Sequence, residues 1–171
     1  MLHPLSACVA FTGHRSYRGG AEEALRRVVA EACARGCRTF LCGMAVGFDL
    51  AAAETVLACR EEFPDLRLLA VIPFPGQAEL FSEEDRVRFG RVITAARTLV
   101  LSDRYHRGVY SARNNFLVDH AAQLVAWFDG SPGGTAYTVR RALRLGRHVD
   151  NLCPEGPVFP PTSSHKAGSF P

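Results

Sequence analysis

Short apolar segments alternate with amphipathic helical patterns along almost the whole chain. The apolar segments lie at residues 5–12, 38–42, 66–72, 97–102, 123–128 and 148–152. The helical patterns lie between them, at 21–36, 49–63, 82–96, 114–122 and 135–146. Strands that alternate with helices of this length form parallel sheets covered on both faces. We therefore predict a three-layer α/β/α fold with a mainly parallel sheet of five to six strands.

The chain has room for one domain with its own core. It has 171 residues, of which 47% are hydrophobic and 22% charged, as in an average globular protein. No apolar run approaches the roughly 20 residues of a membrane-spanning helix, and the start of the chain lacks the basic region of a signal peptide. We expect a cytoplasmic domain over residues 1–152 with no membrane partner. Residues 153–171, which are rich in Pro, Ser and Gly, are predicted to form a flexible tail.

The six cysteines lie mostly among apolar residues of predicted strands and helices. Cys33 and Cys37 are spaced to share a helix face, which leaves a metal or redox role open. However, the chain contains no Cys-x-x-Cys pair and no histidine at ligand spacing. We expect reduced, buried thiols and no metal site.

Glycines and polar side chains gather where the predicted strands end. The carboxyl ends of parallel strands share one edge of a sheet, and ligands bind there, where the strand order reverses. We expect a single ligand-binding site at this edge. Its candidate residues are Thr12, Gly13, His14, Arg15, Gly43, Gly47, Asp49, Arg113, Asn114, Asp129, Gly133, Gly134 and Thr135.

The segment DGSPGGT at 129–135 stops an apolar strand and opens a helix. A Gly-Gly-Thr turn before a helix is common, and structure alone explains it equally well. The alternative is that the free N–H groups of the first helical turn bind an anion, most simply a phosphate. Arginine is the better bidentate phosphate ligand, and nineteen of the twenty basic residues of this chain are arginine.

Several candidate residues have two interpretations. Asp49 is either the N-cap of a helix or a carboxylate directed at ribose hydroxyls or at a reacting water. Arg113 either pairs with an acid such as Asp119 or binds phosphate in a bidentate manner. Three tyrosines are either structural or able to stack on a base: Tyr105, Tyr110 and Tyr137. The Gly-x-x-x-x-Gly-Lys-Ser/Thr and Gly-x-Gly-x-x-Gly motifs are absent, so we expect no Walker-type ATPase, no conventional NAD site and no bound cofactor.

Five segments in order resemble the YpsA-like family of the SLOG superfamily. They are FTGHR (11–15), GMAVGFDLAAAE (43–54), IPFPGQ (72–77), ARNNFLVDHA (112–121) and WFDGSPGGTAYTVRRA (127–142). The resemblance covers about residues 5 to 152. It implies a Rossmann-like sheet and a site for a phosphorylated, nucleotide-derived ligand, either ADP-ribose-like or a nucleoside monophosphate. The protein would sense or process that ligand, and because related domains often pair, a homodimer is its candidate assembly.

Two related groups suggest alternative functions. Lonely Guy phosphoribohydrolases cleave N-glycosidic bonds with an arginine that precedes a helix, as Arg113 does here, and with a glutamate at the position of Thr138. A hydroxyl cannot replace a carboxylate beside an oxocarbenium-like transition state, so Asp49 or Asp129 would have to serve. Arg113 and Asp49 are therefore the candidate catalytic residues. DprA proteins handle single-stranded DNA, and the interleaved Arg and Tyr residues at 104–113 keep nucleic acid as an alternative partner.

Overall fold

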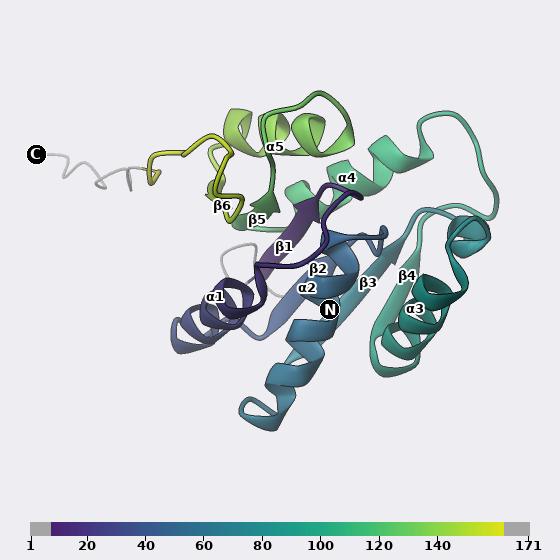
Figure 1. Cartoon of the computed structure of the whole chain (residues 1–171), viewed down its shortest axis with the longest axis horizontal. Helices are drawn as coiled ribbons and strands as arrows, with labels where there is room; N and C mark the ends of the chain where they lie inside the picture. The colour runs from purple at the N-terminus through teal and green to yellow at the C-terminus, as the bar shows by residue number, and fades with distance from the viewer. Residues whose placement is uncertain (1–7, 163–171) are drawn as a thin grey trace, which may run out of the picture.

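The computed structural model describes residues 8–162 and contains a six-stranded sheet (Figure 1). All neighbouring strands pair in parallel, in the spatial order β4-β3-β2-β1-β5-β6. The predicted, mainly parallel α/β fold is confirmed. The strands are β1 (Cys8–Gly13), β2 (Thr39–Cys42), β3 (Arg67–Ile72), β4 (Arg97–Val100), β5 (Gln123–Trp127) and β6 (His148–Asn151).

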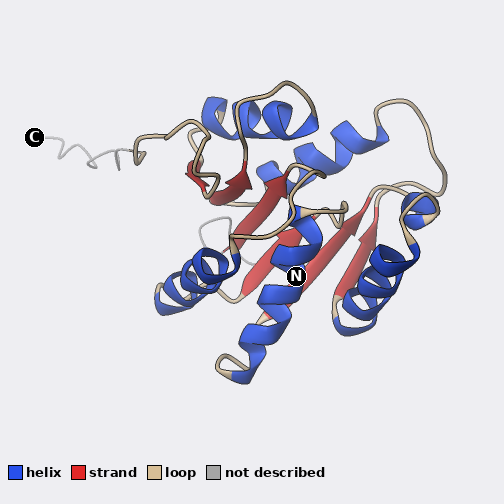
Figure 2. Cartoon of the chain, in the orientation of Figure 1, coloured by secondary structure: helices blue, strands red, loops and turns tan. Residues whose placement is uncertain are grey.

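Helices cover both faces of the sheet (Figure 2). On one face lie α1 (Glu22–Ala34), α2 (Phe48–Ala58) and α3 (Glu83–Ala95), and on the other α4 (Val109–Asp119) and α5 (Gly134–Arg144). Two clusters of buried side chains correspond to the two faces. The first includes Phe11, Phe40, Leu25 and Phe48, and the second includes Ala10, Leu41, Leu117 and Val139.

Three differences between the predicted and the observed helical segments stand out. Helix α4 begins at Val109, before the expected residue 114, because Gly108 takes a left-handed conformation with φ of 91° and turns the chain into the helix. Helix α2 ends at Ala58 and continues as a 3₁₀ turn, Cys59–Glu61. A short 3₁₀ helix, Pro75–Ala78, follows the expected turn after β3.

The strand order reverses at β1, which lies between β2 and β5. The register pairs Thr12 with Ala126 and Gly13 with Trp127, so β1 and β5 end side by side. The loops that follow these two strands, at 14–21 and 128–133, therefore lie on either side of the crevice in which doubly wound sheets bind ligands.

The chain beyond β6 contacts the rest of the domain as far as Phe159, and residues 160–162 are exposed. The N–H of Leu152 donates to the carbonyl of Ala126 at 2.8 Å, Cys153 is buried, and Phe159 packs against the second cluster. The remainder of the expected tail, 163–171, lies outside the described residues, as do residues 5–7 of the first predicted strand.

All six cysteines are buried, as expected, and no disulfide joins them. Burial raises the pKa of every one of these thiols, and that of Cys37 to about 11. The prediction that Cys33 and Cys37 share a helix face is wrong, because α1 ends at Ala34. Within residues 8–162, no three His, Cys, Asp or Glu side chains are grouped to hold a metal ion. No helix of the described part has the length and apolarity to cross a bilayer.

Candidate functional site

A cavity of about 350 Å³ lies where β1 and β5 end, which is small for a ligand pocket. Two of its lining residues, Ala45 and Tyr110, are not among the thirteen predicted site residues. The predicted residues that line it are Thr12, Gly13, His14, Arg15, Asp49, Arg113, Asn114, Gly134 and Thr135. The structure thus brings together residues from the ends of β1, β2 and β5 and from α4.

Asp49 and Arg113 form the interior of this cavity. Their exposed fractions are only 4% and 5%. Asp49 Oδ2 accepts from the N–H of Ala45 at 3.3 Å, but Oδ1 has no hydrogen-bond partner within residues 8–162. Burial raises the pKa of Asp49 to about 6, although the charge of Arg113 opposes this rise. The N-cap of α2 is Gly47, so the N-cap interpretation of Asp49 is wrong.

Backbone and side-chain acceptors hold Arg113 in place. Its Nη1 donates to the carbonyl of Gly43, and its Nε donates to Asn114 Oδ1 at 2.7 Å. Gln77 Nε2 donates to the same Gly43 carbonyl at 3.0 Å. The carbonyl of Gly43 therefore accepts hydrogen bonds from both side chains. Because glycine has no Cβ, position 43 also leaves room for the guanidinium of Arg113.

The interpretation that Arg113 pairs with Asp119 is wrong. Asp119 Oδ1 accepts from Arg141 Nη2 at 2.7 Å. Nη2 of Arg113 has no hydrogen-bond partner in the described part of the chain. Burial lowers the pKa of Arg113, while the charge of Asp49 raises it. Arg113 is therefore a buried guanidinium that lines the cavity, with one donor unused among the described residues.

Asp129 lies outside the cavity lining but contacts one of its residues. Its Oδ1 is 2.7 Å from His14 Nε2 and accepts from Ser131 N at 2.9 Å and Ser131 Oγ at 2.6 Å. The hydrogen bonds from Ser131, with a smaller contribution from His14, lower the pKa of Asp129 to about 2. Asp129 thus has its partners already and shapes the loop, whereas Asp49 has a free oxygen.

Helix α5 begins at the cavity without a side-chain cap. Its N-cap, Gly133, has a φ of 142° and no side chain, so it makes no side-chain cap hydrogen bond to the first turn. Gly134 and Thr135 line the cavity, so the first-turn N–H groups lie next to it. Thr138 is fully buried, and its Oγ1 donates to the carbonyl of Gly134 at 2.8 Å. Its hydroxyl is therefore engaged in the helix.

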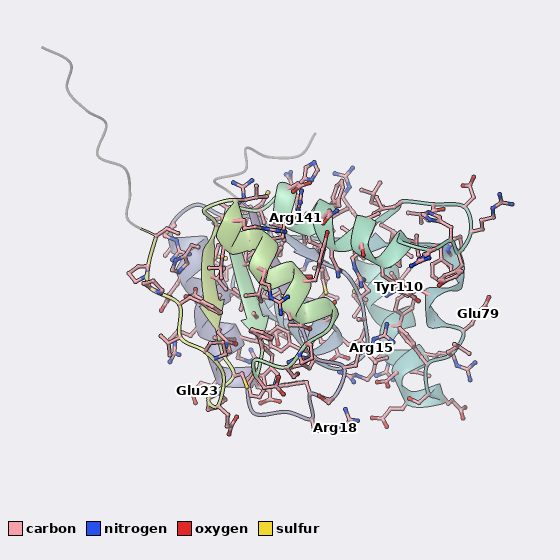
Figure 3. All side chains as sticks on the ribbon, turned by 90° about the horizontal axis from the view of Figure 1, so that it is seen from above. Arg15, Arg18, Glu23, Glu79, Tyr110 and Arg141 are labelled. Carbon is pink, nitrogen blue, oxygen red and sulfur yellow. The ribbon has the colours of Figure 1, made fainter. Side chains whose placement is uncertain are left out.

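Gly47 allows the loop after β1 to approach α2. It has a φ of 82°, and a Cβ there would lie 2.7 Å from the carbonyl oxygens of His14 and Arg15. That loop presents Arg15, whose guanidinium carbon is 5.9 Å from the centre of the Tyr110 ring. The two side chains lie near each other in the view from above (Figure 3).

A larger cavity of about 770 Å³ lies between α1, α2 and α3. It contains only Arg15 and Gly47 of the predicted residues. Arg88 in its wall is already paired with Glu54, at 2.7 Å, and with Asp85, at 3.1 Å. Among residues 8–162, no buried polar atom without a partner lines this cavity, so the smaller cavity is the candidate site.

The sequence does not predict Gln77 as a site residue, and it leaves two interpretations of Tyr110, structural or base-stacking. Tyr110 precedes Arg113 by one turn of α4, but the sequence predicts this helix only from residue 114, so the i, i+3 spacing of the two residues gave no signal. Gln77 reaches the site through a carbonyl that lies 34 residues away in the sequence, and no local pattern indicates such a contact.

A family model described as the YspA SLOG family matches residues 9–150. The uncharacterized SPbeta prophage-derived protein YoqJ of Bacillus subtilis (strain 168) is 25% identical over 131 residues, covering 68% of this chain and 77% of YoqJ. A UPF0398 protein of Bacillus thuringiensis (strain Al Hakam) is 26% identical over 153 residues, covering 81% of this chain and 83% of that protein.

Two solved structures of DNA processing protein A (DprA) share the fold. The Streptococcus pneumoniae protein superimposes with a TM-score of 0.62 at 19% identity over 84% of this chain. The Helicobacter pylori protein, described for its single-stranded DNA binding mode, gives 0.62 at 15% identity over 85% of this chain. The matched regions cover only 49% and 64% of those two DprA chains.

Proposed function

The chain belongs to the YspA SLOG family, and we propose that it binds a phosphorylated nucleotide derivative in the cavity between β1 and β5. One observation carries the proposal. The uncapped start of α5, the free Oδ1 of Asp49 and the buried guanidinium of Arg113 share a single small cavity. A ligand with an anionic group and hydroxyl donors would satisfy all three.

Each part of such a ligand has a partner. The N–H groups of Gly133, Gly134 and Thr135 would bind a phosphate, with Arg113 and Arg15 as the cationic partners. Asp49 Oδ1 would accept a hydrogen bond from a ribose hydroxyl. We propose that the protein senses or processes this ligand in the cytoplasm, and a homodimer remains the assembly to test by sedimentation.

The test uses a charge at the start of α5. Gly134 has ordinary backbone angles, and a Cβ there would meet only Asn114 Nδ2, at 3.8 Å. An aspartate at a first helical position favours the helix, so the Gly134→Asp variant should fold. It should nevertheless lose the thermal stabilisation that ADP-ribose, NAD or a nucleoside monophosphate gives the wild type, because its carboxylate repels phosphate.

Gly90→Asp is the matched control, because Gly90 lies in α3 with open space around it. This variant should respond to ligands like the wild type. A wild type that responds to none of these nucleotides, or a Gly134→Asp variant that still responds, would contradict the proposal.

Asp49 supports a second candidate function, the hydrolysis of the N-glycosidic bond. A pKa of about 6 suits a group that moves protons near neutral pH, and Asp49 lines the cavity with an Oδ1 that has no partner among the described residues. A water oxygen would bond to C1′ of the ribose as the C1′–N bond breaks. The base would leave with a proton, giving free base and ribose 5-phosphate. Chromatography after long incubation should show these products with the wild type, and binding without turnover with Asp49→Asn. Binding without turnover in the wild type leaves only the sensing role.

A further inference from the structure

Three aromatic rings meet beside the candidate cavity, and we call Phe74, Tyr105 and Tyr110 the aromatic corner. The ring centres are 5.6 Å apart for Phe74 and Tyr105, 5.9 Å for Phe74 and Tyr110, and 6.4 Å for the two tyrosines. The rings come from two segments of the chain: Phe74 follows β3, whereas Tyr105 and Tyr110 lie between β4 and the first turn of α4. Folding therefore assembles this corner from distant parts of the chain.

The corner continues from the interior of the cavity to the surface. Tyr110 lines the cavity and is half-buried, whereas Tyr105 is 61% exposed. The interplanar angles of about 75° show that Phe74 packs against both tyrosines edge-on rather than in a stack. No neighbouring ring is therefore stacked on the face of Tyr105 within the described residues.

Cationic groups flank the same rings. The guanidinium carbons of Arg15 and Arg113 each lie 5.9 Å from the centre of the Tyr110 ring, within the range of a cation–π contact. Planar aromatic and guanidinium groups are the surfaces on which nucleobases stack.

The aromatic corner also lies next to the groups proposed to bind phosphate. Tyr110, Arg113 and Asn114 share one face of α4 by their spacing, and all three line the cavity together with the start of α5. If the phosphate of a nucleotide binds at the start of α5 and its ribose binds at Asp49, its base still needs a binding surface. The aromatic corner is the apolar, planar surface available to it at this cavity.

We propose that the aromatic corner is the subsite for the nucleobase of the ligand, an inference that rests on the proposed function. Rings hold a base through its face, so the subsite accepts purines and pyrimidines alike. The base belongs either to a free nucleotide or to a nucleotide within a single strand, because both offer the same base and phosphate.

The experiment compares ligands with and without a base. Ribose 5-phosphate and the four common nucleoside monophosphates are titrated into the full chain by calorimetry. At least one monophosphate should bind roughly tenfold more tightly than ribose 5-phosphate, since stacking on one side chain corresponds to about 5- to 150-fold in affinity. Tyr105→Leu should reduce this ratio and leave ribose 5-phosphate binding unchanged. Tyr110→Leu should also reduce the ratio, and Tyr105→Phe should keep it.

Tyr137→Leu is the matched control. Tyr137 lies on α5, is 36% exposed and donates to Asn115 Oδ1 at 2.7 Å, away from the cavity lining. Its variant should retain the wild-type ratio. Equal affinity for ribose 5-phosphate and every monophosphate, or an unchanged ratio in both leucine variants, would overturn the inference alone. A wild type that binds none of these probes would overturn the proposed function with it.

A second arm identifies the source of the base. A 5′-phosphorylated oligodeoxythymidylate is tested by gel retardation at low and high salt. Tighter binding of this strand than of thymidine monophosphate, lost in Tyr105→Leu, assigns the subsite to single strands. Binding of monophosphates without retardation of the strand assigns it to free nucleotides, and either result supports the base subsite.

Discussion

Asp49 lies in surroundings that disfavour its charge, although Arg113 is close enough to attract it. The pKa of Asp49 already includes the attraction of Arg113 and still rises from 3.8 to about 6. Ionising this carboxyl therefore costs the folded state a net free energy of about 3 kcal/mol, from the difference between these pKa values. The cost is fully present above pH 6 and disappears below pH 4.

Replacement of Asp49 by asparagine should increase stability at pH 7.5. The amide is close in shape to the protonated carboxyl, so the variant avoids the cost of ionisation, up to about 3 kcal/mol. The folded carboxyl holds its proton more tightly than the unfolded one, so the advantage of the variant should shrink as the pH falls from 6 to 4. Urea unfolding of both proteins across this range measures the difference.

Asp103→Asn provides the control, because Asp103 is exposed. Its unfolding free energy should follow that of the wild type across the same range. A constant difference between Asp49→Asn and wild type from pH 4 to pH 7.5 would show that burial does not raise the pKa of Asp49.

At the scale of residues, the sequence predicted which residues line the cavity better than it predicted the contacts between them. Asp49 and Arg113 were placed at one edge of the sheet because each follows a strand, and the structure places both in one cavity. The bond of Arg113 to the carbonyl of Gly43 joins residues 70 positions apart. Such a contact depends on how the strands are arranged and not on local spacing.

At the scale of elements, the strand β6 and the chain after it hold the loop that leads to α5. The side chain of Asn151 accepts from Phe128 N at 3.0 Å and donates to Phe128 O at 2.8 Å and Pro157 O at 2.9 Å. A Cβ on Gly156 would collide with the carbonyl of Phe128. The family match ends at residue 150, so Asn151, Gly156 and Pro157 lie beyond it.

Replacement of Asn151 by alanine should loosen this loop. The variant leaves the N–H and C=O of Phe128 without these hydrogen bonds, and we expect a loss of about 1–3 kcal/mol in unfolding free energy. The affinity for the nucleotide ligand should fall as well, because the N–H groups of Gly133 and Gly134 follow this loop. Urea unfolding and calorimetry on the same preparation measure the two effects.

Val149→Ala is the comparison variant, because Val149 is buried in the same strand but packs in the second cluster. It should lose stability while the folded protein keeps its affinity. If both variants lose stability and neither loses affinity, Asn151 supports the fold only.

The start of α4 and the contacts made by the chain after β6 could not be predicted from the sequence. A polar segment with Gly108 fits a loop or a helix start, and the conformation of that glycine decided between them. Proline-rich composition indicated a flexible tail, yet the packing of Phe159 depends on an apolar surface built by other elements.

At the scale of the whole molecule, the cysteines are buried throughout the core. Five of the six belong to the two core clusters, on both faces of the sheet, and Cys153 is 6% exposed. Burial raises the pKa of all six thiols, so little thiolate forms near neutral pH.

We expect a thiol reagent such as Ellman's reagent to modify the native protein at pH 8 no faster than the chain unfolds. In denaturant, all six thiols should react at once. The absorbance of the released chromophore follows the reaction, with free cysteine as the reference for an unprotected thiol. A thiol in the native protein that reacts as quickly as free cysteine would show that part of the core opens without global unfolding.

The alternation of strands and helices predicted the layers and the parallel sheet, because each helix must return the chain to the same end of the sheet. It did not predict the spatial order of the strands. That order depends on which strand edges pair, and here β1 pairs with β5 across 114 residues, as in the match of Val9 with Gln123. The position of the cavity follows from this pairing.

The position of β1 in the centre of the sheet has a consequence during synthesis. One edge of β1 can pair with β2 soon after both leave the ribosome, but the other edge waits for β5. Until then an apolar strand exposes unpaired backbone groups, which is a hazard for aggregation in a nascent chain. Nascent chains halted before β5 should therefore depend on chaperones, whereas chains released after β6 should not.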